Sequence, residues 1–225
     1  MPVCSIIIPA LNEAQTIENT LARLAPYRQA GCEIIVVDGG SIDATREIAR
    51  SHADLCFQSA RGRAVQMNAG AERATAPMLW FLHADTCPPD KALQIVDRLG
   101  QAGDGWGFFA LRLSGDAIWC RVLEIFINKR SQLSATGTGD QGLFCHRSLF
   151  SRVGGFAALA LMEDIELCAR LKREVSPQVL QQWPLVTSSR RWESRGVVAT
   201  VLLMWRIRCA FWLGVNHRTL ARRYR

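Results

Sequence analysis

The sequence lacks the cysteine patterns that hold small extracellular or zinc-binding domains together. Its eight cysteines are dispersed, with no C-x-x-C pair and no partner histidine at zinc-finger spacing. The start, MPVCSIIIPA, also lacks the basic segment and long apolar run of a signal peptide. The chain has 225 residues, 49% of them hydrophobic, and a chain of this size buries a core without disulfides or a structural metal. We therefore expect one globular domain, with or without an appendage, in a reducing cytoplasm.

Acidic residues are missing from the C-terminal end. The last 32 residues, from Ser194 to Arg225, contain seven arginines and no Asp or Glu. The remainder holds 20 basic and 20 acidic residues, so the whole formal charge of +7 lies in this tail. A nucleic-acid-binding protein needs basic residues spread over one face with stacking aromatics. Because the body of the chain is electrically balanced, we expect no nucleic-acid partner.

The tail also lacks an apolar run long enough to cross a bilayer. Its uncharged stretches, Gly196–Trp205 and Cys209–Asn216, are ten and eight residues long and are separated by Arg206 and Arg208. A spanning helix needs about 20 mostly apolar residues. Trp and Phe interleaved with Arg favour an amphipathic basic helix on a lipid headgroup layer. The alternative is a core helix packed on the domain, followed by a solvated basic end.

Apolar β-branched runs alternate with helical patterns in the first hundred residues. The strand patterns are Cys4–Pro9, Glu33–Asp38, Asp54–Gln58 and Met78–Leu82. The helical patterns are Ala14–Leu24, Asp43–Ser51, Arg63–Ala74 and Asp90–Leu99. Continuous apolar strands separated by helices predict an α/β fold with a mostly parallel central sheet flanked by helices. We expect residues 1–195 to form this domain and residues 196–225 to form the amphipathic basic helical segment.

Polar residues follow three of the predicted strands. Asn12 and Glu13 follow the first, Asp38 begins a D-G-G-S run after the second, and His83-Ala84-Asp85 ends the fourth. Ligands of open parallel sheets bind beyond the carboxyl ends of the strands. Asp and Asn also favour turns and helix caps, which explains any single position equally well. Three such ends together indicate a ligand site.

No phosphate-binding glycine loop follows the first strand. The absence of G-x-G-x-x-G and of G-x-x-x-x-G-K-[ST] excludes a dinucleotide fingerprint and a Walker loop. A carboxylate such as Asp38 accepts a hydrogen bond from a base or a sugar but repels phosphate. A diphosphate therefore needs a cation, which Asp85 can hold as Mn²⁺ or Mg²⁺, and Arg61 and Arg63 can add bidentate contacts. The pattern favours a nucleotide diphosphate bridged by a metal.

Four segments, in this order, resemble the signature series of family 2 glycosyltransferases with the GT-A fold. They are PALNE (Pro9–Glu13), VVDGGSIDAT (Val36–Thr45), HAD in place of D-x-D (His83–Asp85) and MEDIEL (Met162–Leu167). Further segments are similar to a small bacterial subgroup often described as diaponeurosporenoate-like, or carotenoid-acid, glycosyltransferases. These are Arg61–Ala71, Gly139–Phe156 and Thr187–Gly196. The resemblance covers roughly residues 3–195 and would place the protein in carotenoid biosynthesis.

The resemblance implies inverting, metal-dependent hexosyl transfer from a nucleotide-diphosphate sugar, with a UDP-sugar favoured. It implies a lipid or isoprenoid acceptor and a peripheral position at the cytoplasmic face of the cell membrane, or a cytoplasmic one. The implied nucleotide-binding residues are Pro9, Ala10, Asn12, Glu13, Asp38, Arg61, Arg63 and His83. Asp85 would hold the metal, and Asp164 would be the base, with Glu163 orienting it or the acceptor. The implied acceptor or diphosphate contacts are Gly139, Asp140, Gln141, Arg191 and Trp192.

Two of these implied roles have structural alternatives. His83 and Asp85 share a face of a strand, so the imidazole can address the nucleotide or ligate a softer ion such as Mn²⁺. It can equally pack under the neighbouring loop. Glu163 and Asp164 open a helix pattern with acids first and bases last, which complements a helix dipole without any catalytic role.

Two other functions compete with the glycosyltransferase hypothesis. A nucleotidyltransferase would carry a Gly-rich, Lys-containing loop after the first strand, and PALNEAQT contains neither residue. A non-catalytic, basic membrane-surface module would use only the C-terminal segment. A metal-dependent glycosyltransferase remains the favoured hypothesis.

Overall fold

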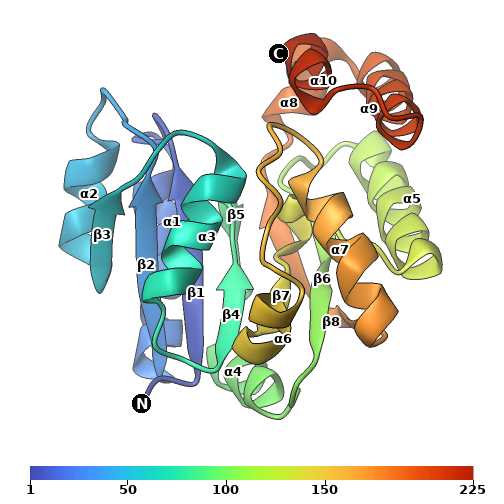
Figure 1. Ribbon diagram of the computed structural model, residues 1–225. Helices are drawn as coiled ribbons and strands as arrows, with labels where there is room; N and C mark the ends of the chain where they lie inside the picture. The colour runs from blue at the N-terminus through green and yellow to red at the C-terminus, as the bar shows by residue number, and fades with distance from the viewer. Residues whose placement is uncertain (225) are drawn as a thin grey trace.

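The computed structural model describes residues 1–224 of the chain. Five side chains in its C-terminal part lie outside the description: Arg191, Ser194, Arg195, Arg218 and Tyr224. Figure 1 shows a sheet that runs across the molecule, with helices on both sides and the last helices at the end opposite the N-terminus.

Eight described strands form one sheet in the order β3-β2-β1-β4-β7-β6-β8-β5. Their bounds are β1 Cys4–Ala10, β2 Cys32–Asp38, β3 Leu55–Gln58, β4 Met78–Phe81, β5 Thr86–Cys87, β6 Trp106–Leu113, β7 Phe144–His146 and β8 Gln178–Thr187. Strands β3, β2, β1 and β4 are parallel, as are β6 and β8. β7 is antiparallel to both of its neighbours, and β5 to β8. The mostly parallel α/β sheet is confirmed.

Helices cover the two faces of the sheet because alternate strand residues point to opposite sides. Their bounds are α1 Ile17–Gln29, α2 Thr45–His52, α3 Arg63–Arg73, α4 Ala92–Gly100, α5 Ile118–Ser134, η1 Gly139–Gln141, α6 Arg147–Arg152, α7 Glu163–Glu174, α8 Arg190–Arg195, α9 Val197–Trp212 and α10 His217–Tyr224. Ile6 and Ile8 of β1 pack with α1 and α4, whereas Ile7 packs with α3, α6 and α7.

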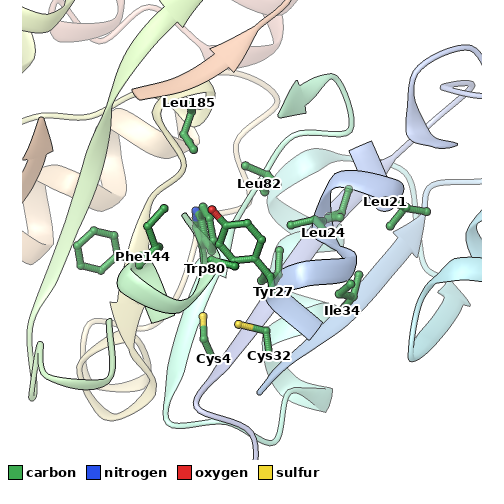
Figure 2. Packing of buried hydrophobic residues seen from close by; sticks show 14 of the residues in the cluster. Cys4, Leu21, Leu24, Tyr27, Cys32, Ile34, Trp80, Leu82, Phe144 and Leu185 are labelled. Atoms are coloured by element: carbon green, nitrogen blue, oxygen red, sulfur yellow. The ribbon is translucent and has the colours of Figure 1, made fainter. Parts of the chain in front are cut away.

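Aromatic side chains join the N-terminal half of the sheet to the C-terminal half. The ring of Trp80 in β4 lies 5.5 Å from that of Tyr27 and 4.9 Å from that of Phe109. Figure 2 shows Trp80 beside Tyr27, with Phe144 on its other side. The Tyr27 hydroxyl donates to the carbonyl oxygen of Pro89 at 2.7 Å. Both halves therefore share one core, and the positions of their loops are fixed relative to each other.

The helical segment expected for residues 196–225 contains two helices, α9 and α10. α9 ends where Gly214 adopts a left-handed conformation with φ of 80°, a backbone state that favours glycine at helix ends. Ile207 of α9 and Leu220 of α10 are buried against Met162 and Ile165, so the segment packs on the domain. Trp205 stays 66% exposed. In the part of the chain that the structure describes, no helix has the length and apolarity needed to cross a bilayer.

Candidate active site

A cleft of about 1690 Å³ opens at the carboxyl ends of β1 and β4. Its polar lining comes from segments that are far apart in the sequence. These residues include Glu13, Arg61, Arg63, His83, Asp85, Asp140 and Arg190. The structure therefore brings the polar ends of the first and fourth strands to one cleft, as the position of ligand sites in open sheets predicts.

The loop after β1 forms one wall of this cleft. Pro9, Ala10 and Glu13 line it. Buried Gln66 donates from Nε2 to the carbonyl oxygens of Ala10 and Val37, at 2.9 and 2.8 Å, and so joins the ends of β1 and β2. This residue is a positioning group that the motif analysis did not single out, although it lies within the quoted Arg61–Ala71 segment.

Asn12 connects the first loop to the second rather than facing the cleft. It adopts a left-handed conformation with φ of 55°. Its Oδ1 accepts from the backbone N–H of Ile42 at 3.0 Å, and its own N–H donates to Ser41 Oγ at 2.9 Å. A direct contact of Asn12 with a nucleotide stays a prediction.

Asp38 lies at the end of β2 beside Ala10 of β1, and only 1% of its surface is exposed. Its carboxylate accepts from the backbone N–H groups of Gly40 and Ser41, each at 3.1 Å, and from Ser41 Oγ at 2.5 Å. Gly40 permits this turn because its φ is 89°. In this structure Asp38 holds the turn and does not line the cleft, so a hydrogen bond to a base stays a prediction.

The His83 imidazole is held on both sides by the loop that contains η1. Its Nδ1 lies 3.0 Å from Oδ1 of Asp140, and its Nε2 side faces Gly139, where an added Cβ would come within 2.4 Å. Burial alone would lower the pKa of His83, but the hydrogen bond to Asp140 and the charge of that carboxylate outweigh burial and raise it. This geometry matches the packing alternative for His83.

Carboxylates near His83 have the chemistry to bind a divalent cation. The described residues contain no group of three or more His, Cys, Asp or Glu side chains that could hold a metal by themselves. Asp85 and Asp140 both line the cleft, and carboxylate oxygens suit Mg²⁺ and Mn²⁺. Mg²⁺ is usually bound through one or two carboxylates together with substrate phosphates. The donor set therefore fits an ion shared with a diphosphate, and Asp85 as its ligand stays a prediction.

Glu163 and Asp164 stand at the start of α7, after Met162, which adopts a left-handed conformation with φ of 70°. Glu163 is 4% exposed, and its Oε1 lies 3.2 Å from Nε of Arg63. Burial raises the pKa of Glu163, Arg63 opposes this rise, and the nearby charge of Asp164 adds to it. This ion pair therefore connects the start of α7 to the start of α3.

The Asp164 carboxylate accepts two backbone N–H groups. Oδ2 accepts from Gly139 at 2.8 Å and Oδ1 from Ile165 at 2.7 Å. Glu163 and Asp164 border a small cavity that also has His83 and Gly139 in its wall, and His83 lines the main cleft as well. The expected catalytic pair therefore lies beside the cleft, behind the imidazole.

The remaining predicted contacts have different surroundings. Gln141 is buried; its Oε1 accepts from Ser131 Oγ at 2.8 Å and its Nε2 donates to the carbonyl oxygen of Phe109 at 3.2 Å. It holds the loop and does not line the cleft. Trp192 lines the cleft and packs with the apolar cluster around α5. The side chain of Arg191 lies outside the described residues.

Sequence reasoning missed two sources of cleft residues. β5 is only two residues long, too short for a periodic pattern, yet its pairing with β8 sets Thr86 beside Thr187 and so brings Thr187 and Ser188 to the cleft. Arg130 of α5 and Arg208 of α9 also line it. An arginine that interrupts an apolar helix, as Arg208 does, is the signal that could have indicated a polar cavity.

The fold and the cleft define a class of α/β protein with a ligand site at the carboxyl ends of parallel strands. The sequence model of glycosyl transferase family 2 matches residues 5–148. The chain belongs to this family, and its fold is of the GT-A type, as expected. The carotenoid subgroup stays a prediction.

Relatives agree with this membership. The PGL/p-HBAD biosynthesis glycosyltransferase of Mycobacterium bovis is 30% identical over 169 residues, which covers 70% of this chain and 62% of the relative. The validoxylamine A glucosyltransferase of Streptomyces hygroscopicus is 38% identical over 105 residues, which covers 43% of this chain and 25% of the relative. The chain thus spans 62% of the length of the first of these curated relatives and 25% of the second.

Solved structures share the fold at low sequence identity. The mannosyltransferase PcManGT from Pyrobaculum calidifontis, in complex with GDP-Man and Mn²⁺, has a TM-score of 0.64 at 22% identity, over 93% of this chain and 61% of that one. S. aureus TarS in complex with UDP-GlcNAc has a TM-score of 0.65 at 16% identity, over 83% of this chain and 58% of that one.

Proposed function

We propose that the chain is an inverting glycosyltransferase that moves a sugar from a nucleotide-diphosphate donor, UDP-sugars favoured, to a lipid or isoprenoid acceptor at a membrane surface. One observation carries the proposal: Glu13, Asp85 and Asp140, from three separate segments, line one cleft together with Arg61 and Arg63. Carboxylates suit the hydroxyls of a sugar or ribose, and the arginines suit a diphosphate. The complexes of the similar folds with UDP-GlcNAc and with GDP-Man and Mn²⁺ support the same class of donor.

In this proposal the donor binds with its nucleoside beside Pro9, Ala10 and Glu13. A divalent cation held by Asp85 would neutralise charge on the diphosphate leaving group. Arg61 and Arg63 line the same cleft and donate to phosphate oxygens. His83, fixed by Asp140, keeps the loop before Asp85 in place.

The transfer itself is a single displacement. The acceptor oxygen forms a bond to the anomeric carbon as the bond from that carbon to the diphosphate oxygen breaks, and the electron pair leaves with the diphosphate. The proton of a hydroxyl acceptor passes to Asp164, the proposed base. Glu163 lies next to it and is held by Arg63 at 3.2 Å, so it acts as a positioning residue.

Donor binding is tested by thermal shift with UDP-, GDP- and dTDP-sugars, with and without Mn²⁺, because a ligand selective for the native state raises its melting temperature. We expect Asp85→Asn to lose the part of the shift that depends on Mn²⁺. Asp97→Asn, on the exposed face of α4, is the matched control and should keep it. A full Mn²⁺ response in Asp85→Asn would exclude Asp85 as the ligand.

The base is tested by single-turnover transfer to a hydroxyl acceptor. Asp164→Asn should bind the donor normally but transfer at least about 10²-fold more slowly, the usual effect of losing a general base. Wild-type rates in this variant would mean that another group takes the proton or that the acceptor arrives ionised.

Membrane contact is proposed for the exposed side of α9, where Trp205 and Trp212 lie beside a basic segment. Truncation is a poor test because Ile207 and Leu220 are buried in the domain. Trp212→Ser should instead lower co-sedimentation with anionic vesicles. Replacing exposed Ile42 with Ser is the control for surface apolarity elsewhere, and equal vesicle binding by both variants would reject this contact.

A further inference from the structure

α5 and α9 supply an apolar part of the cleft wall, an apolar groove that adds to the polar lining described above. In Figure 1 α9 lies above one end of α5, and Val201 of α9 packs against the apolar cluster that contains Leu123 of α5. Phe126 of α5 and Trp205 of α9 line the groove while 69% and 66% exposed, respectively. A nucleotide sugar has little apolar surface for such walls. Exposed apolar surface in a ligand cleft is typical of a site for an apolar group.

Two arginines, one from each helix, stand in the wall of the same cleft. Arg130 of α5 and Arg208 of α9 both line it and are partly buried. Among the described residues, no Asp or Glu forms an ion pair with either of them. Nη2 of Arg130 donates to Ser131 Oγ at 2.9 Å, whereas its Nε is buried without a hydrogen-bond partner. The guanidinium N–H groups that face the cleft are the donors that a ligand can use.

The two guanidinium groups line the same cleft, and the charge of Arg208 acts on Arg130. Burial, and then the positive charge of Arg208, lower the pKa of Arg130 to about 10. Burial likewise lowers the pKa of Arg208, and the charge of Asp164 opposes the change in both. A guanidinium group keeps its charge at neutral pH in proteins. Two poorly hydrated like charges destabilise the empty site, and a bound anion would relieve their repulsion.

We propose that Arg130 and Arg208 bind the anionic group, a phosphate or a carboxylate, of an acceptor whose apolar chain lies between α5 and α9. This rests on the proposed function, because the ligand is the acceptor of that transfer. A neutral hydrocarbon would leave the arginines unpaired, and a free anion would leave the apolar walls uncovered. An anionic amphiphile satisfies both parts of the groove at once, and its headgroup lies near Asp164.

The test uses four probes at concentrations below micelle formation: octyl phosphate, octanoate, octyl glucoside and inorganic phosphate. Calorimetric titration of the full chain should show that one of the two anionic amphiphiles binds at least tenfold more tightly than octyl glucoside and than inorganic phosphate. The better of the two identifies the headgroup. Arg130→Gln and Arg208→Gln should each weaken that probe roughly 10- to 100-fold, as expected for a charge-assisted hydrogen bond.

Arg206→Gln is the matched control, since Arg206 lies on α9 with an exposed side chain and is not among the cleft residues. It should bind all four probes as the wild type does. If a variant fails to fold, a measurement on the wild type still tests the proposal. Its affinity for the anionic amphiphile should fall as the KCl concentration rises, whereas its affinity for octyl glucoside should stay the same.

Three results would overturn the proposal. They are equal affinity for the charged and neutral amphiphiles, an affinity for the better anionic amphiphile equal to that for inorganic phosphate, and a salt-independent affinity for that amphiphile. Thermal shift with nucleotide sugars, measured in the same variants, distinguishes failure of this acceptor-site proposal from failure of the proposed function. A wild type that binds no nucleotide sugar would reject that function and leave the amphiphile result standing.

Discussion

Gly139 is the position where a single methyl group should disturb the candidate site most. A Cβ there would lie 2.4 Å from Nε2 of His83 and 2.5 Å from its Cε1, about 1 Å closer than ordinary van der Waals contact. The ring is not free to turn away, since Nδ1 is held 3.0 Å from Asp140. Overpacking of this kind costs about 1–3 kcal/mol. The lost hydrogen bond adds roughly 1 kcal/mol, at the low end because the Asp140 side chain is 47% exposed.

We therefore expect Gly139→Ala to lower the free energy of unfolding by about 2–4 kcal/mol and to weaken donor binding, because His83 must shift next to Asp85. Urea denaturation of the two single variants and the double variant tests the cause. In a His83→Ala background the added methyl group should cost less than about 0.5 kcal/mol, since the atoms that it meets are gone. The same cost in both backgrounds would refute the packing of His83 against Gly139.

Two further predictions concern the scaffold. Oε1 of Glu33 accepts from Ser5 Oγ and from the N–H of Thr75, each at 2.5 Å; burial raises its pKa, but these bonds outweigh burial and lower it below 4.5. This stabilisation is present above pH 4.5 and is lost as the pH falls through the folded-state pKa, so Glu33→Gln should cost about 1–2 kcal/mol at pH 7 and progressively less as the pH falls below 4.5 in urea denaturation. A cost that stays the same over this range would contradict this. At Gly107 a Cβ would lie 1.9 Å from the backbone oxygen of Gln178, so Gly107→Ala should abolish cooperative unfolding monitored by circular dichroism, and a wild-type transition would contradict the close approach of β6 and β8.

The sheet could be predicted because its strands are buried on both faces. Continuous apolar runs placed the ends of β1, β2 and β4 within one residue of their observed positions. Short elements were missed, since the two residues of β5 and the six of α6 are too few to show a period. The antiparallel direction of β7 depends on its long-range pairing with β4 and β6, which no local pattern contains.

The site could be predicted only in part. Strand ends correctly indicated that Glu13, His83 and Asp85 meet at one cleft. They did not indicate that the Asp38 carboxylate accepts hydrogen bonds within its own turn. The sequence alone does not distinguish an acid that is hydrogen-bonded in a turn from one that faces a ligand. Arg130 and Arg208 were missed for another reason: their cleft forms between helices separated by more than sixty residues in sequence.

Three polar contacts connect the loops of the candidate site to one another. Arg63 joins the start of α3 to Glu163, His83 joins the end of β4 to Asp140, and Gly139 joins the η1 loop to Asp164. Each contact links two segments that are distant in sequence, and the three together form a chain from α3 through α7 and η1 to Asp85. A substitution in any of these loops therefore changes the position of the others. The motifs that are short and separate in the sequence are therefore connected by these contacts in one candidate site.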